Sequence, residues 1–168
     1  MNKGTKIVVV LFVVFVVAAV PLYFYLHSGG EQEGTLQIKG LVSNPYNLTI
    51  SELRALPSSN IEVTLDSSTH LDEEGTFTYT GVTLWSLLES ADVSVDASSV
   101  YVKAIDGYGL TLRLTDVQHD SSVLLVYEKD GQPLVALADG GEGPIRLVIG
   151  SDQYAQRWVK SVVALDVR

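Results

Sequence analysis

The sequence contains no cysteine, and this absence removes a large part of protein chemistry from the chain. Without thiols there is no disulfide bond, no thiolate ligand for a metal and no cysteine nucleophile. Stability must come from a hydrophobic core, and the fold does not depend on the redox state of its compartment. Any metal centre or reactive group has to be built from other side chains.

Positive charge is also scarce. Lysine and arginine number 11 against 20 aspartate and glutamate residues. Because Lys3 and Lys6 lie at the N-terminus, the chain from residue 27 onward has 9 cations and 20 anions, a formal charge of −11. Such a domain is repelled by phosphate backbones and by anionic headgroups. We therefore expect no nucleic acid partner, and we interpret the acidic surface as favouring solubility.

Residues 7–26, IVVVLFVVFVVAAVPLYFYL, form an uncharged hydrophobic run. At about 1.5 Å per residue, a helix of this length matches the roughly 30 Å hydrocarbon core of a bilayer. A cleaved signal peptide has a shorter core of about 7–15 residues, so we predict an uncleaved transmembrane helix. Lysines precede it and glutamates follow it, which places residues 1–6 in the cytoplasm and the rest outside the cell membrane.

The remaining chain divides into a short connector and one domain. Residues 27–34, HSGGEQEG, have the polar, glycine-containing composition of a linker. Residues 35–168 have the length of a single domain that buries enough surface to fold without disulfides.

Strand patterns dominate this domain, and two short helices interrupt them. The capping-box pattern Thr49-x-x-Glu52 begins one helix, and leucines at helical spacing predict another over Thr83–Ser90. Everything beyond that second helix is predicted to be β-structure. We expect an α+β fold with a mainly mixed or antiparallel sheet. The predicted strands are Leu36–Gly40, Ile61–Leu65, Val100–Ile105, Leu110–Thr115, Val123–Glu128, Pro133–Leu137, Ile145–Ile149 and Trp158–Val167.

The C-terminal third resembles a known family. The stretch LLVYEKDGQPLVALADGGEGPIRLVI, residues 124–149, followed by Trp158-Val159-Lys160, is similar to the C-terminal signature of the sulfite oxidase-like molybdopterin-binding domain. The likeness extends over nearly all of residues 35–168, with landmarks at residues 36–45, Gly81-Val82-Thr83-Leu84 and Asp106-Gly107-Tyr108. This resemblance implies the α+β fold of that family.

The resemblance also implies a cofactor site. It places Arg146 at the arginine that contacts the pterin, and Trp158, Val159 and Lys160 on a segment that contacts the same cofactor. Arginine binds phosphate through a planar fork, whereas lysine provides a point charge. Alternatively, Arg146 and Lys160 pair with nearby carboxylates such as Glu142 or Asp166.

The sequence departs from the family where the metal would bind. In Thr64-Leu65-Asp66-Ser67, Ser67 stands at the position of the cysteine that ligates molybdenum in the oxidases. A serine hydroxyl is a much harder donor than a thiolate. The histidine expected in the loop of residues 139–144 is missing, and so is the arginine-rich stretch after the cysteine. We therefore expect no catalytic residue and no cofactor, although molybdopterin remains possible by resemblance.

Other polar clusters are weaker candidates. Asp66 with His70, and Asp116 with His119 and Asp120, lack a recognised spacing of metal ligands, so we interpret them as solvated loop residues. For the aromatic residues Tyr108 and Trp158, core packing is a better explanation than stacking on a ligand.

These observations favour a membrane-anchored, extracytoplasmic binding or accessory module that does not catalyse a molybdenum reaction. One alternative is an active molybdopterin-dependent oxidoreductase in which Ser67 or Asp66 ligates the metal. It would need an external electron-transfer partner, because the sequence has no haem or iron–sulfur motif. Another is a structural domain that docks against a membrane protein. The expected partners are the cell membrane and either a membrane protein or a small anionic ligand.

Overall fold

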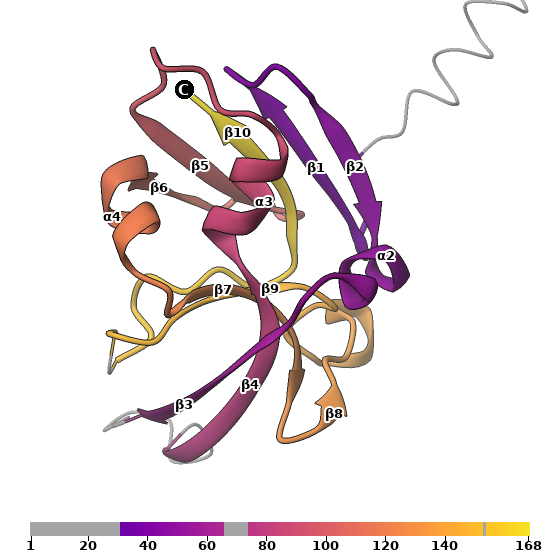
Figure 1. The fold of residues 1–168 in the computed structure, drawn as a ribbon. Helices are drawn as coiled ribbons and strands as arrows, with labels where there is room; N and C mark the ends of the chain where they lie inside the picture. Colours follow the sequence, from indigo (N-terminus) through magenta and orange to yellow (C-terminus); the bar gives the residue numbers. More distant parts are fainter. Residues whose placement is uncertain (1–30, 66–73, 153) are drawn as a thin grey trace, which may run out of the picture. The chain divides into compact units, whose positions relative to one another are not determined.

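The computed structural model describes residues 31–65, 74–152 and 154–168 (Figure 1). The predicted transmembrane helix over residues 7–26 and the candidate residue Ser67 lie outside this part. Among the residues that are described, no helix is both long enough and apolar enough to cross a bilayer. Residues from Glu31 to Arg168 belong to one compact unit.

The first sheet contains the N-terminal and C-terminal strands side by side. Its order is β2 (Tyr46–Thr49), β1 (Thr35–Gly40), β10 (Val162–Val167), β5 (Ser99–Ala104) and β6 (Gly109–Arg113). Strands β1 and β10 pair in parallel, and the other neighbours are antiparallel. The two ends of the domain therefore support each other through backbone hydrogen bonds.

The second sheet is antiparallel and carries the candidate site. It contains β3 (Ser59–Leu65), β4 (Gly75–Thr83), β7 (Val123–Lys129) and β8 (Gln132–Pro133), with β9 (Arg146–Ile149) also paired to β7. A β-bulge lies between Thr80 and Gly81. At Gly81 an added Cβ would lie 2.3 Å from the Leu125 carbonyl oxygen, so the close approach of β4 and β7 requires glycine.

Short helices connect the strands. These are α2 (Ile50–Ala55), α3 (Leu84–Ser90), α4 (Leu114–His119) and the 3-10 helix η2 (Leu137–Asp139). The predicted capping box is confirmed. The Thr49 hydroxyl accepts from the Glu52 N–H, and the Glu52 carboxylate accepts from the Thr49 N–H at 2.8 Å.

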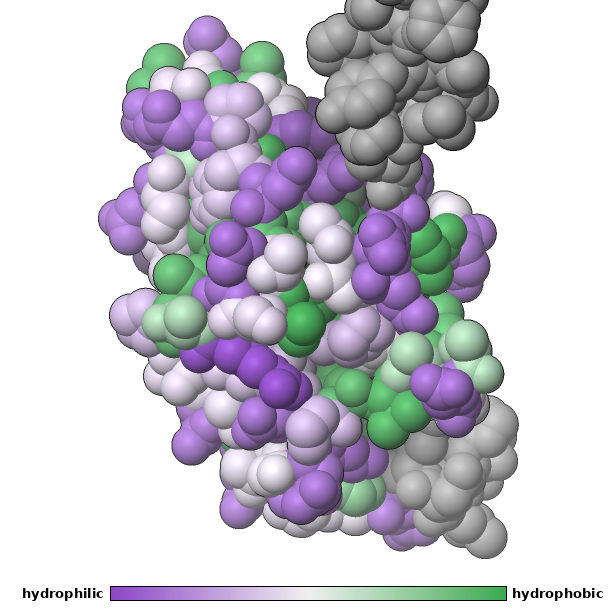
Figure 2. Space-filling view, turned by 90° about the vertical axis from the view of Figure 1, so that its right-hand side faces the viewer, coloured by the Kyte–Doolittle hydropathy of each residue, from purple (hydrophilic) through white to green (hydrophobic). Residues whose placement is uncertain are grey.

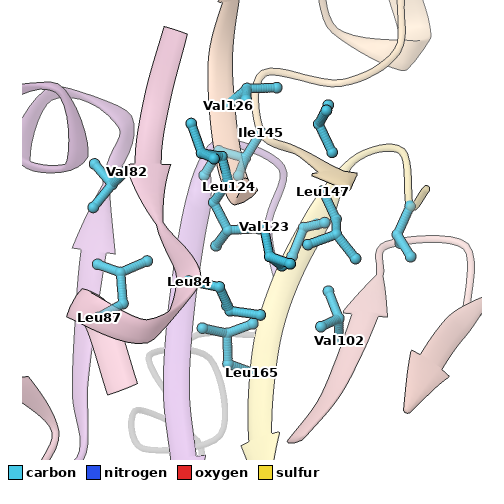
Figure 3. Close-up of a cluster of buried hydrophobic side chains, with 14 of the residues drawn as sticks. Val82, Leu84, Leu87, Val102, Val123, Leu124, Val126, Ile145, Leu147 and Leu165 are labelled. Atoms are coloured by element: carbon cyan, nitrogen blue, oxygen red, sulfur yellow. The ribbon is translucent and has the colours of Figure 1, made fainter. Parts of the chain in front are cut away.

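The hydrophobic core lies where the two sheets and α3 meet, as Figure 3 shows. Val102 and Leu165 come from the first sheet, Leu124 and Leu147 from the second, and Leu84 from α3; all five are fully buried. Burying a side chain of this kind contributes about 1.5–3 kcal/mol. The core therefore joins the sheets into one folding unit.

The predicted α+β class with mixed and antiparallel pairing is confirmed, but the prediction of β-structure throughout the C-terminal half was wrong. Strand β6 ends at Arg113, and α4 follows where the alternating pattern suggested continued strand. Leu114 and Val117, three residues apart, are both buried. Tertiary burial at helical spacing thus overrides the local period of two.

Two predicted strands are shorter than expected. The strand predicted over Pro133–Leu137 is reduced to Gln132–Pro133, and because β8 pairs only with β7, Pro133 does lie at an edge. The strand predicted over Trp158–Val167 begins only at Val162, because Ser161 has a left-handed backbone, with φ +47°. Strands β2 and β4 were not predicted.

Candidate functional site around Glu142 and Arg146

Arg146 lies at the start of β9, opposite Val126 of β7. Its side chain is only 5% exposed, and it forms an ion pair with Glu142, four residues earlier. The guanidinium carbon is 4.9 Å from the centroid of the Trp158 ring, a cation–π distance. The positive charge of Arg146 is thus stabilised within the protein by Glu142 and by the ring of Trp158.

Glu142 also holds the second predicted cation. The Lys160 ammonium is 3.5 Å from the other carboxylate oxygen of Glu142. Asp166, the alternative partner, instead pairs with Arg168 at 2.8 Å. We call Glu142, Arg146 and Lys160 the Glu142 cluster. Of the two carboxylates predicted as alternative partners, Glu142 and Asp166, Glu142 is therefore the one that pairs with both cations.

The glycine-rich loop brings Glu142 to this position. Gly143 has φ +86°, and an added Cβ would lie 2.4 Å from the Cα of Ser161. The two backbones are held together because the Ser161 N–H donates to the Glu142 carbonyl at 2.8 Å. Only glycine fits this left-handed close approach. The loop therefore packs closely against the segment that precedes β10.

Trp158 is 5% exposed, which confirms the prediction of core packing. Its indole N–H donates to the Ile149 carbonyl at 3.1 Å, and its ring meets that of Tyr79 edge to face at 5.4 Å. For Tyr108 the same prediction was wrong, because this side chain is 51% exposed. The Asp106 carboxylate accepts from the Tyr108 N–H at 2.9 Å, as expected for turn chemistry.

Val159 is fully buried and forms an isolated bridge with Leu147. Two backbone hydrogen bonds, of 2.8 and 3.3 Å, join these residues. This bridge fixes the residues on either side of Val159, one packed inward on Arg146 and the other directed toward Glu142. The contribution of Val159 is therefore to position its neighbours.

Sequence reasoning missed three neighbouring residues of the second sheet, of which Tyr79 contacts Trp158. Phe77 and Tyr79 lie on β4, and the Lys129 ammonium is 3.7 Å from the Phe77 ring centroid and 5.9 Å from that of Tyr79. The period-two alternation of threonine with aromatic residues in the segment Thr76–Thr80 was the signal for this strand. It places Tyr79 inward, against Trp158.

The Ser67 position lies outside the described residues, but the strands that flank it are described. Gly81, Val126 and Arg146 form one row across the sheet, whereas Leu65 pairs with Gly75 at the end where the loop begins. Six residues along β4 separate that end from the row, about 20 Å at 3.3 Å per residue. In Figure 1, β3 and β4 run away from β9 toward this end.

The other acidic cluster has local structural roles. Asp116 pairs with Arg113 at 2.9 Å, and Asp120 accepts from the Ser122 hydroxyl at 2.6 Å. His119 Nδ1 is 2.7 Å from the Thr115 carbonyl oxygen. Across the described ranges, no group of three potential ligands could hold a metal ion. Asp66 and His70 fall outside those ranges.

A cavity of about 300 Å³ adjoins the Glu142 cluster. Its lining combines polar and apolar residues from β7, β8 and the loop that follows. These residues are Lys129, Gln132, Pro133, Leu134, Val135, Gly141 and Glu142. Glu142 is shared between this cavity and the ion pairs with Arg146 and Lys160. A ligand in the cavity would therefore meet a carboxylate already bound to two cations.

The described residues do not fit a bound molybdopterin. A pterin phosphate needs accessible donors, but the Arg146 side chain is buried, and Glu142 pairs with both candidate cations. Arg146 Nε is the one buried donor of the cluster with no acceptor in the described part of the chain. A thiolate ligand is excluded by the composition.

The family model of the oxidoreductase molybdopterin binding domain matches residues 27–168. No curated protein matches the sequence. Among solved structures, the chain resembles the sulfane dehydrogenase SoxCD from Paracoccus pantotrophus, with a TM-score of 0.66 and 23% sequence identity. The match covers 83% of this chain and 39% of that chain, so the likeness concerns the fold of one part of the larger protein.

The family model thus spans most of the chain, and its range includes the whole Glu142 cluster. The sheet-rich α+β fold agrees with this match. The chain belongs to the oxidoreductase molybdopterin-binding domain family.

Proposed function

We propose that the chain is a membrane-anchored, extracytoplasmic module that uses the molybdopterin-domain fold for binding or accessory work, without molybdenum catalysis. The observation that carries this proposal is the Glu142 cluster. A single carboxylate binds both cations that a cofactor phosphate would require. In this chain these residues stabilise the fold.

Energetics support this interpretation. Separating a buried ion pair by removing one partner costs about 3–5 kcal/mol. Glu142 and the face of Trp158 already contact the Arg146 guanidinium, so a phosphate bound there would have to share this buried cation with a carboxylate. A phosphate would also have to compete with Glu142 for Lys160, which lies at the surface. The cluster therefore opposes the binding mode that the family resemblance implies.

The membrane part of the proposal rests on the sequence. The uncharged run over residues 7–26 is long enough to cross a bilayer, and the lysines before it favour a cytoplasmic N-terminus. The domain would then lie outside the cell membrane, where a membrane protein or a small ligand could reach the cavity beside Glu142. With a volume of about 300 Å³, this cavity is at the lower end of ligand-binding pockets.

Elemental analysis tests the proposal. The full chain, purified from a cell that synthesises the molybdenum cofactor, should contain far less than stoichiometric molybdenum. The reason is that no thiolate is present and that Glu142 pairs with both cations that could bind the cofactor phosphate. A family member with the cysteine, purified in parallel, provides the positive control. Near-stoichiometric molybdenum that is lost in Ser67→Ala would instead support the oxidoreductase alternative.

The organic part of the cofactor is measured in the same samples. Pterin fluorescence after acid release should be absent from the wild type. Pterin present without molybdenum would show that the fold still binds the cofactor although the metal is lost. In that case Arg146→Ala should remove the pterin, and the role assigned to the Glu142 cluster would be wrong.

A further inference from the structure

The beginning of the described chain is tied to the domain by two carboxylates. Both oxygens of Glu31 accept from the Lys103 ammonium, at 2.7 and 2.9 Å, and Lys39 lies 3.7 Å from the same carboxylate. Lys103 is the penultimate residue of β5, next to the turn of residues 105–108. Glu31 thus holds the start of the described chain against side chains of β1 and β5 in the first sheet.

Glu33 makes a second attachment, to the loop that leads to the Glu142 cluster. One of its carboxylate oxygens accepts from the Leu137 N–H at 3.0 Å and from the Ser161 hydroxyl at 2.7 Å. Ser161 is buried, and its carbonyl accepts from the Ile105 N–H at 3.0 Å. Glu33 therefore joins the start of the chain to both the 105–108 turn and the loop around η2.

Four of the seven exposed large hydrophobic residues in the described part of the chain lie on these same two loops. Ile105 and Tyr108 belong to the turn, and Val135 and Leu137 to the loop; their exposed fractions range from 36% to 51%. Figure 2 views the side of the domain on which β1 begins and β8 lies, and hydrophobic surface is visible there between hydrophilic areas. We call Ile105, Tyr108, Val135 and Leu137 the connector face.

Chain length limits how far this face can lie from a membrane. Residues 27–30, four in number, separate the predicted span from Glu31. Fully extended, four residues reach at most about 14 Å. The headgroup region on one side of a bilayer is about 5–8 Å thick. Because Glu31 is held by Lys103 and Glu33 by Leu137 and Ser161, the limit applies to the part of the domain around these contacts.

We propose that the connector face lies against the membrane interface and inserts its apolar side chains between the lipid headgroups. This inference rests on the proposed membrane anchor. Electrostatic attraction does not drive the contact, since the part of the chain beyond the span has a formal charge of −11. The short connector brings the face to the membrane, and burial of aliphatic and tyrosine side chains stabilises it there.

The absence of cysteine makes the test direct, because each introduced cysteine is the only labelling site. The full chain with Val135→Cys or Tyr108→Cys is labelled with the fluorophore NBD and reconstituted into phosphatidylcholine vesicles that contain lipids with a headgroup nitroxide. Both labels should shift to shorter emission wavelength and lose most of their fluorescence. Val95→Cys is the matched control, because Val95 is 99% exposed.

Val95 is also far from the connector face. The Leu41 carbonyl, one residue beyond β1, accepts from the Ser94 N–H, so this region lies at the end of β1 opposite to Glu33. A six-residue strand spans about 20 Å. The label at Val95 should therefore keep its fluorescence. Equal, weak quenching at all three positions would overturn the proposed orientation.

The role of the two attachments is tested in the Val135→Cys chain by changing Glu31→Gln and Glu33→Gln together. The domain should then move more freely, and quenching of the label should fall. Glu62→Gln, which removes an exposed carboxylate from β3, should leave quenching unchanged. Unchanged quenching in the double variant would contradict a membrane contact set by these two carboxylates.

Flotation of the vesicles separates failure of this inference from failure of the anchor. If the chain floats with the vesicles and the labels are not quenched, the anchor is supported and the orientation is wrong. If the chain does not float, both the anchor and the orientation fail. Quenching that appears only after a membrane protein is added would identify a protein, and not lipid, as the occupant of the face.

Discussion

At the scale of single residues, the Glu142 cluster has an imbalance of charge that determines its behaviour. One carboxylate is shared by a buried guanidinium and a half-exposed ammonium. Arg146 depends on Glu142 far more than Lys160 does, because Lys160 can be solvated. Stacking on Trp158 stabilises the guanidinium but does not neutralise it. Glu142 is therefore the residue that makes burial of Arg146 tolerable.

Glu142→Gln should accordingly destabilise the domain by about 3 kcal/mol, because it leaves a buried cation without its counter-charge. Urea unfolding followed by tryptophan fluorescence measures the change. Asp139→Asn, at an exposed position in the same loop, is the matched control and should shift stability by less than about 0.5 kcal/mol.

A double variant shows whether the effect comes from the unpaired charge. Replacing both partners, Glu142→Gln with Arg146→Met, should restore much of the lost stability, since no charge is then buried alone. Equal losses in the single and double variants would contradict this account and would point to packing of the loop itself.

Part of this site could be predicted from the sequence. The choice between a cofactor contact and an ion pair with Glu142 was visible, because the four-residue separation brings Glu142 and Arg146 within reach. The contribution of Tyr79 was not, because its contact with Trp158 joins strands far apart in the chain. Ser161 was equally hidden, because its left-handed backbone is set by the close approach of Gly143.

At the scale of elements, the contact between β2 and α3 depends on one hydroxyl. Tyr46 donates from β2 to the Leu87 carbonyl in α3 at 2.8 Å. Burial raises the pKa of Tyr46 above its ordinary value of 10.0, and a hydrogen bond with Ser90 opposes part of that rise. The folded state therefore favours the protonated phenol, which alone can donate to a carbonyl.

The raised pKa gives a pH dependence with a definite sign. Stability from the neutral phenol is fully present below the pKa of the unfolded chain and is lost as pH rises through the higher folded pKa. Tyr46→Phe should cost about 1 kcal/mol at neutral pH, and its stability should then fall less steeply than that of the wild type above pH 10. Denaturant unfolding at a series of pH values checks both effects.

Tyr154→Phe is the control for this measurement, because Tyr154 is 62% exposed. It should retain the wild-type slope of stability against pH. If Tyr46→Phe and Tyr154→Phe had the same slope, the contact between β2 and α3 would not be sensitive to pH, and another group would cause the alkaline loss of stability.

Elements were predictable to the extent that local pattern and tertiary burial agree. The α2 capping box and the α3 leucine spacing are local signals, and both helices form where they were predicted. Helix α4 was not predicted, because Leu114 continues the alternation of β6 and yet is buried together with Val117. No property of that segment alone separates the two outcomes. The packing of α4 against the core determines which one forms.

At the scale of the whole domain, the parallel pairing of β1 with β10 closes the fold around its two chain ends. Glu33, two residues before β1, accepts from the Ser161 hydroxyl and so contacts the residue that follows Lys160 of the Glu142 cluster. Gln32 accepts from the Thr35 N–H at 3.0 Å, and the Gly34 carbonyl accepts from the Ile50 N–H at 2.9 Å. The linker was predicted over residues 27–34, and its described residues form hydrogen bonds with the domain.

Two fragments measure that contribution. Residues 31–168 and residues 35–168 should both unfold in one cooperative step, since both contain the complete core. The shorter fragment loses the hydrogen bonds of residues 31–34 and leaves the buried Ser161 hydroxyl without the Glu33 carboxylate. With about 0.5–1.5 kcal/mol for each such bond, it should be less stable by roughly 2–3 kcal/mol. Glu33→Gln in the longer fragment should reproduce part of this loss, and equal urea midpoints for the two fragments would show that the connector is not part of the folded domain.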